Sequence, residues 1–146
     1  MTTTAEKPLI LEITRHFDAP PERVFDAWLS KDWGDWVGPP GIRGEVTQLE
    51  SRVGGRYRIV MHRPDGTTLP VWGTYREIAR PSKLVFSWKW EFEDADTIVT
   101  LTFKPSKGGT EMTLQHEGFT NTERRDSHNQ GWTGTLDKLA AFLGKV

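Results

Sequence analysis

The sequence predicts a single α+β domain in which a curved antiparallel sheet of six to seven strands packs against one long C-terminal helix. Between residues 44 and 116, apolar and polar residues alternate in short runs separated by glycine- and proline-containing turns. This alternation is typical of an antiparallel sheet with one solvated face. After residue 120 the apolar spacing becomes helical. Because the sheet would otherwise expose its apolar face, we expect the helix to cover it, with the order β-α-α-β-β-β-β-β-β-α along residues 1–146.

The N-terminal part of the chain predicts one strand and two short helices. Apolar and polar residues alternate from Leu9 to Phe17, which predicts a half-buried strand. Two acidic residues and two prolines within residues 18–22 are typical of the start of a helix, and apolar residues follow at helical spacing. A second short helix is predicted from Lys31 to Trp36. The sequence Gly-Pro-Pro-Gly at 38–41 ends regular structure there.

The middle of the chain predicts the other strands. Proline and glycine at 64–66 form a hairpin signal, since proline presets the turn entry and glycine accepts a positive φ. The clearest strand carries an apolar residue at every second position, and four of its five inward residues are aromatic. Strands are predicted at Gly44–Glu50, Arg56–Arg63, Leu69–Ile78 and Leu84–Phe92, and around Leu101 and Leu114.

The C-terminal helix is predicted from Asn121 to Gly144, about 36 Å at about 1.5 Å per residue. Thr120 and Glu123 have the spacing of a capping box, and Gly118 ends the preceding strand. The inward stripe of this helix is polar in its first half and apolar in its second. This gradient predicts that the first half borders a cavity and that the second half packs in the core.

Composition excludes several classes of function. The chain has no cysteine, which excludes disulfides and thiolate chemistry. The net charge is −1 without a basic run, so we expect no nucleic-acid partner. No signal peptide or apolar run of about 20 residues is present, which predicts a cytoplasmic protein without membrane insertion. Metal-ligand spacings and phosphate-binding motifs are absent, so we expect no metal and no cofactor.

The aromatic strand and the helix together predict a ligand cavity between them. The indole N–H groups of Trp88 and Trp90 need acceptors, which a hydrocarbon core lacks but a partly wet cavity or a ligand oxygen provides. His116 and His128 fall on inner faces, and we interpret them as hydrogen-bonded core or cavity residues rather than acid–base catalysts. Arg125 would help to orient a polar group of the ligand. The candidate cavity residues are Tyr57, Ile59, Phe86, Trp88, Trp90, Leu101, Met112, Leu114, His116, Arg125, His128 and Trp132.

Five segments, in the same order, are similar to the activator of Hsp90 ATPase homologue family. Residues 17–28 resemble its first-helix signature, and residues 54–57, 65–66 and 73–78 resemble its central hairpin. The remaining similarities are Trp36-Val37-Gly38-Pro39 to a Trp-Trp-Gly-Pro stretch, residues 84–88 to an aromatic strand, and His116 to Phe119 with His128, Gly131, Trp132, Leu136 and Leu139 to the C-terminal run. Val37 stands where the family often has a second tryptophan.

The resemblance implies the helix-grip fold of the START and birch-pollen-allergen (Bet v 1-like, SRPBCC) superfamily. It also implies binding or carriage of a small hydrophobic molecule, such as a lipid, polyketide or aromatic compound, between sheet and helix. One alternative is a cyclase- or hydrolase-type enzyme that uses His116 and His128 in the same cavity. Another is a chaperone-interacting module, which predicts an exposed apolar patch around Trp33, Trp36 and Trp72.

Overall fold

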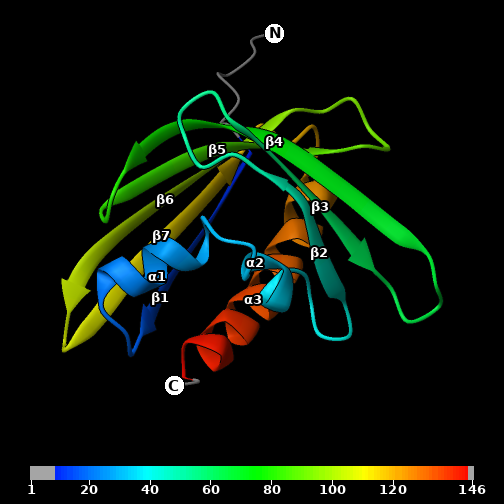
Figure 1. Ribbon diagram of the computed structural model, residues 1–146. Coiled ribbons are helices and arrows are strands. Elements are labelled where there is room, and N and C mark those ends of the chain that lie inside the picture. The colour runs from blue at the N-terminus through cyan, green and yellow to red at the C-terminus, as the bar shows by residue number, and fades with distance from the viewer. Residues whose placement is uncertain (1–8, 145–146) are drawn as a thin grey trace, which may run out of the picture.

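The computed structural model describes residues 9–144 and shows one seven-stranded antiparallel sheet curved around a long helix (Figure 1). This confirms the predicted α+β class and the helix-grip architecture. The elements are β1 (Ile10–Phe17), α1 (Pro21–Ala27), α2 (Trp33–Trp36), β2 (Arg43–Leu49), β3 (Arg56–His62), β4 (Thr68–Ala79), β5 (Lys83–Trp90), β6 (Thr97–Ser106), β7 (Gly109–Glu117) and α3 (Thr122–Leu143).

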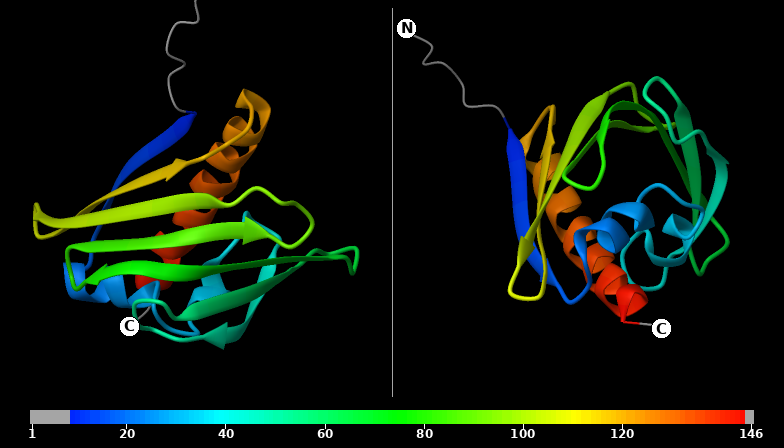
Figure 2. Two further views of the ribbon diagram at one scale, coloured as in Figure 1. Left: turned by 90° about the horizontal axis from the view of Figure 1, so that it is seen from above. Right: turned by 60° about the vertical axis from the view of Figure 1, so that its left-hand side comes forward.

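The sheet has the spatial order β1-β7-β6-β5-β4-β3-β2. Strands β2 to β7 follow one another, whereas β1 pairs with β7 at the far edge, so that Phe17 lies opposite Thr110. The register shifts at Thr47 in β2 and at Arg76 in β4. Such bulges bend a strand and increase its twist. The sheet accordingly curves around α3, as the two views of Figure 2 show.

The hydrophobic core fills the concave side of the sheet, where α1 and α2 close the open end beside α3 (Figure 1). Trp28, Trp33 and Trp36 have no exposed surface, and the rings of Trp33 and Trp36 lie 5.7 and 4.7 Å from that of Trp28. The predicted exposed patch is therefore wrong. Because α2 contacts both β2 and α3, its indoles face inward, while Trp72 is half-buried beside Arg56 and Lys89.

Several predicted boundaries differ from the structure by one or two residues, and two of these differences have a clear local cause. Strand β5 ends at Trp90 rather than at Phe92, because the Glu93 amide donates to the Trp90 carbonyl and turns the chain. Helix α3 is capped by Asn121 rather than by the predicted pair Thr120 and Glu123. The Asn121 side chain accepts a hydrogen bond from the Arg124 amide at 2.8 Å, the usual role of an N-cap side chain.

Within residues 9–144, no helix is both long and apolar enough to cross a membrane.

Candidate functional site

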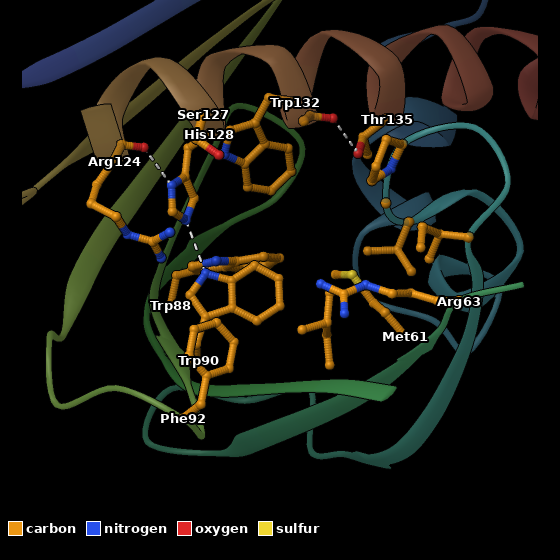
Figure 3. A pocket seen from close by; sticks show the side chains of 16 residues that line it. Met61, Arg63, Trp88, Trp90, Phe92, Arg124, Ser127, His128, Trp132 and Thr135 are labelled. Atoms are coloured by element: carbon orange, nitrogen blue, oxygen red, sulfur yellow. Dashed lines mark hydrogen bonds between the residues drawn. The ribbon is translucent and has the colours of Figure 1, made fainter. Parts of the chain in front are cut away.

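A pocket of about 310 Å³ opens between the first half of α3, strands β3 to β5 and the loop of residues 37–42 (Figure 3). Aliphatic and aromatic side chains form most of its wall, and polar groups come mainly from α3. Its lining residues are Val37, Gly38, Pro39, Ile42, Met61, Arg63, Leu69, Trp88, Trp90, Phe92, Arg124, Ser127, His128, Gly131, Trp132 and Thr135.

Three indoles form one side of the pocket. Trp88 and Trp90 lie two residues apart on β5, so the alternation of the strand directs both toward α3. The Trp88 ring meets Trp90 edge-on at 5.5 Å and Trp132 of α3 at 5.0 Å. Phe92, just beyond the strand, stacks on Trp90 at 5.6 Å between ring centroids, although the residue is 59% exposed. The wall is therefore a set of aromatic faces and edges suited to an apolar ligand.

His128 holds Trp90 in place. The Trp90 Nε1–H donates to His128 Nε2 at 2.9 Å, and because that nitrogen accepts, Nδ1 carries the proton and donates to the Arg124 carbonyl at 2.7 Å. Burial lowers the pKa of His128, which favours the neutral ring. Both ring nitrogens are thus engaged in structural hydrogen bonds.

His116 likewise holds Trp132 in place, deeper in the core than His128. The Trp132 Nε1–H donates to His116 Nδ1 at 2.9 Å, and His116 Nε2 lies 2.7 Å from the Thr97 hydroxyl. That hydroxyl donates to the Trp88 carbonyl at 2.8 Å, so it accepts the Nε2 proton. Burial, and to a lesser extent the nearby His128, lowers the pKa of His116 well below its usual range. Both histidines are neutral, and neither has a ring nitrogen free to take a proton from a substrate.

The acceptor of the Trp90 indole therefore comes from a different source than predicted. The Trp90 N–H is satisfied by His128, not by water or ligand. Within residues 9–144, the buried N–H of Trp88 has no hydrogen-bond partner. The two imidazoles lie 5.2 Å apart, but only His128 lines the pocket.

The loop of residues 37–42 forms the opposite side of the pocket and is attached to α3. The Lys138 ammonium donates to the carbonyls of Val37 at 3.0 Å, Ile42 at 2.9 Å and Pro39 at 3.5 Å. A Cβ on Gly134 would lie 2.8 Å from the Pro40 ring, so a glycine is needed for this close approach. The loop is consequently a fixed wall.

Gly131 leaves the helical wall open. A Cβ at this position would meet no heavy atom within 4 Å, although Gly131 lies in the interior of α3 and lines the pocket. Glycine costs about 1 kcal/mol in a helix interior relative to alanine. The structure thus places bare helix backbone against the pocket at a cost in helix stability.

The predicted site residues divide into two groups. Trp88, Trp90, His128 and Trp132 line the pocket, whereas Tyr57, Ile59, Phe86, Leu101, Met112, Leu114 and His116 are buried in the core behind it. Arg125 turns aside and pairs with Asp126 at 3.1 Å. Arg124 lines the pocket instead, because it precedes His128 by about one helical turn.

Several lining residues were not among the predicted ones, including Arg63, Leu69 and the side chains of residues 37–42. Strand alternation contained a signal for Arg63: Tyr57, Ile59 and Met61 share the inner face of β3, and Arg63 continues the same parity. No local pattern indicated that residues 37–42 fold over α3.

Titratable side chains do not assemble into a metal centre in the described part of the chain. Among residues 9–144, no group of three or more His, Cys, Asp or Glu side chains is placed to hold a metal ion.

Comparison with known proteins identifies relatives of this fold. The sequence matches the family described as "Activator of Hsp90 ATPase homolog 1-like protein" over residues 18–144. A solved protein from Chromobacterium violaceum is 26% identical with a TM-score of 0.88, covering 94% of this chain and 98% of that one. The AHSA1 protein from Silicibacter pomeroyi is 29% identical with a TM-score of 0.81, covering 92% and 96%. A protein from Rhodobacter sphaeroides is 28% identical with a TM-score of 0.78, covering 94% and 93%. A comparison with curated proteins gave no significant match.

Proposed function

The chain belongs to the Activator of Hsp90 ATPase homolog 1-like family, and from this membership and the geometry of its pocket we propose that it binds a small, largely apolar molecule between α3 and the sheet. The observation that carries the proposal is the pocket wall. Three indoles and Phe92 face the aliphatic side chains of Val37, Ile42, Met61 and Leu69 across the space.

The size of the pocket restricts the ligand. Small-molecule sites span about 300–1,000 Å³, and a pocket of about 310 Å³ lies at the lower end of that range. A compound with one or two rings, or a single short chain, fits this space. A lipid with two long acyl chains does not fit within it.

The hydrogen bonds of the two histidines favour binding over catalysis. His128 supports Trp90, and His116 supports Trp132, with both nitrogens of each ring occupied. An acid–base role would require one of these bonds to break before a substrate proton could be transferred. Their role in the proposed function is to fix the indoles that contact the ligand.

The open space beside Gly131 provides the test. We expect naphthalene-2-carboxamide, a neutral aromatic probe, to change the tryptophan fluorescence of the wild type saturably. Gly131→Leu places a side chain in the pocket, and we expect it to weaken binding at least tenfold. Asn129→Leu adds the same side chain at an exposed position of α3 and serves as the control.

Two results would contradict the proposal. One is the absence of a saturable change with the naphthalene probe and with 1-decanol. The other is equal binding by wild type and Gly131→Leu, provided that thermal melting shows the variant to be folded.

A further inference from the structure

Arg63 places a positive charge at the wall of a largely apolar pocket. It follows the last residue of β3, and its backbone is held by the hairpin: its amide donates to the Thr67 carbonyl at 2.9 Å and its carbonyl accepts from the Gly66 amide at 3.0 Å. Figure 3 shows the side chain reaching from the β3 side of the pocket toward Trp90. The hairpin therefore presents this guanidinium to the space in which a ligand would lie.

Arg63 is exposed, and its guanidinium is not neutralised by an ion pair with any of the described residues 9–144. Its Nη1 donates to the Thr67 hydroxyl at 3.3 Å, and across residues 9–144 no carboxylate oxygen lies within 4 Å of its guanidinium. Asp65 lies in the same hairpin, but hydrogen bonds from Thr67 are the main cause of its lowered carboxyl pKa, and Arg63 has a smaller influence.

The other charged residue of the pocket wall, Arg124, does have a carboxylate partner. Arg124 pairs with Glu93, with Nη2 and Oε1 2.6 Å apart. Glu93 does not line the pocket, and neither does any other acidic residue between positions 9 and 144. Among the described residues, the lining thus contains two guanidinium groups and no carboxylate, and of the two arginines only Arg124 forms an ion pair.

We infer that the ligand is an amphipathic organic acid whose anionic group is bound by Arg63 while its apolar body lies against the indoles; this inference rests on the proposed function. A guanidinium stays charged at every physiological pH, and its planar donors match the two oxygens of a carboxylate. The apolar wall excludes water from one side of the contact, which strengthens the ionic hydrogen bonds. Arg63 then selects for acids over neutral molecules of the same shape.

The test compares two probes of nearly equal shape, naphthalene-2-carboxylate and naphthalene-2-carboxamide, by calorimetric titration. The wild type should bind the carboxylate about tenfold more tightly than the amide, the effect of one charge-assisted contact. Arg63→Met should remove this preference and leave amide binding within about twofold. Arg52→Met removes an exposed arginine in the turn at the opposite end of β3 and should leave both affinities unchanged.

The outcomes separate the two proposals. Equal affinities of both probes for the wild type, or an unchanged carboxylate affinity in folded Arg63→Met, would overturn the role of Arg63 and leave the proposed function in place. If the wild type binds neither naphthalene probe and also fails to bind 1-decanol, the proposed function is overturned, and the present inference with it. Loss of carboxylate affinity in Arg63→Met alone supports both.

Discussion

Alanine substitutions at Gly131 and Gly134 should change the stability of the protein in opposite directions. Both glycines lie in the interior of α3, so both substitutions bring the same gain in helix propensity, about 1 kcal/mol. Their surroundings differ. A Cβ on Gly131 would meet nothing within 4 Å, whereas a Cβ on Gly134 would lie 2.8 Å from Pro40 Cδ and 3.3 Å from Pro39 Cα. A proline ring and its backbone cannot rotate away as a flexible side chain would.

The expected magnitudes follow from these contacts. Gly131→Ala should raise the free energy of unfolding by about 0.5–1 kcal/mol, which corresponds to a melting temperature about 1–4 °C higher in a domain of this size. Overpacking costs about 1–3 kcal/mol. Gly134→Ala should therefore lower the free energy of unfolding by as much as about 2 kcal/mol after its propensity gain. The difference between the two variants isolates the steric cost, because the propensity contribution cancels.

Urea unfolding monitored by tryptophan fluorescence provides the assay, since the core contains several buried indoles. Equal slopes with denaturant would show that the midpoints report stability alone. A destabilised Gly131→Ala would refute the open space beside that residue. A Gly134→Ala variant as stable as Gly131→Ala would refute the close contact between α3 and the loop of residues 37–42.

Three further predictions concern the interactions that hold the pocket wall. Lys138→Met should lower the free energy of unfolding by about 1–3 kcal/mol in urea titrations, because loop carbonyls lose a charged donor, while the same change at exposed Lys31 should have little effect. Thr97→Val should lower the free energy of unfolding by about 2–3 kcal/mol, since the buried Nε2–H of His116 loses its acceptor. Thr102→Val, on the exposed face of the same strand, is the control. Equal losses of stability in the two variants would refute the role of the Thr97 hydroxyl. The free energy of unfolding should fall as the pH decreases below about 6.5, because the histidines of lowered pKa stay neutral when folded and gain protons when unfolded. Each histidine contributes at most about 1.4 kcal/mol per pH unit to the slope of the free energy of unfolding. A free energy of unfolding that stays constant from pH 7.5 to 5.5 would contradict this prediction.

Strand parity and turn chemistry were sufficient to predict most of the fold. The alternation of β5 placed its aromatic side chains on the inner face, and the glycine after β7 ended that strand as expected. The errors lie at element ends. Phe92 continues the alternation in sequence, but a turn hydrogen bond to the Trp90 carbonyl ends the strand first. Asn121 competes with Thr120 as a cap, and both have suitable side chains.

The candidate site could be predicted only in part, because periodicity gives the face of a residue and not its depth. His116 and Phe86 point inward as predicted, yet they lie in the core behind the pocket wall. Arg125 and Arg124 are separated by one helical step of about 100°, and that step decides which of them reaches the pocket. Arg124 lies one turn before His128, whose ring donates a hydrogen bond to the Arg124 carbonyl. The two residues therefore share the face of α3 that borders the pocket.

The sequence by itself determined the class of fold, the order of its elements and the helix whose polar half faces the pocket. These follow from periodicities and turn residues that act over a few neighbouring positions. Only the tertiary structure decided that His116 and His128 serve as partners of indoles and that Lys138 fixes the loop. It also decided that Arg63 lines the pocket with no ion-pair partner in the described part of the chain. Each of these depends on contacts between segments far apart in the chain, and such contacts are set by how the sheet curves around α3.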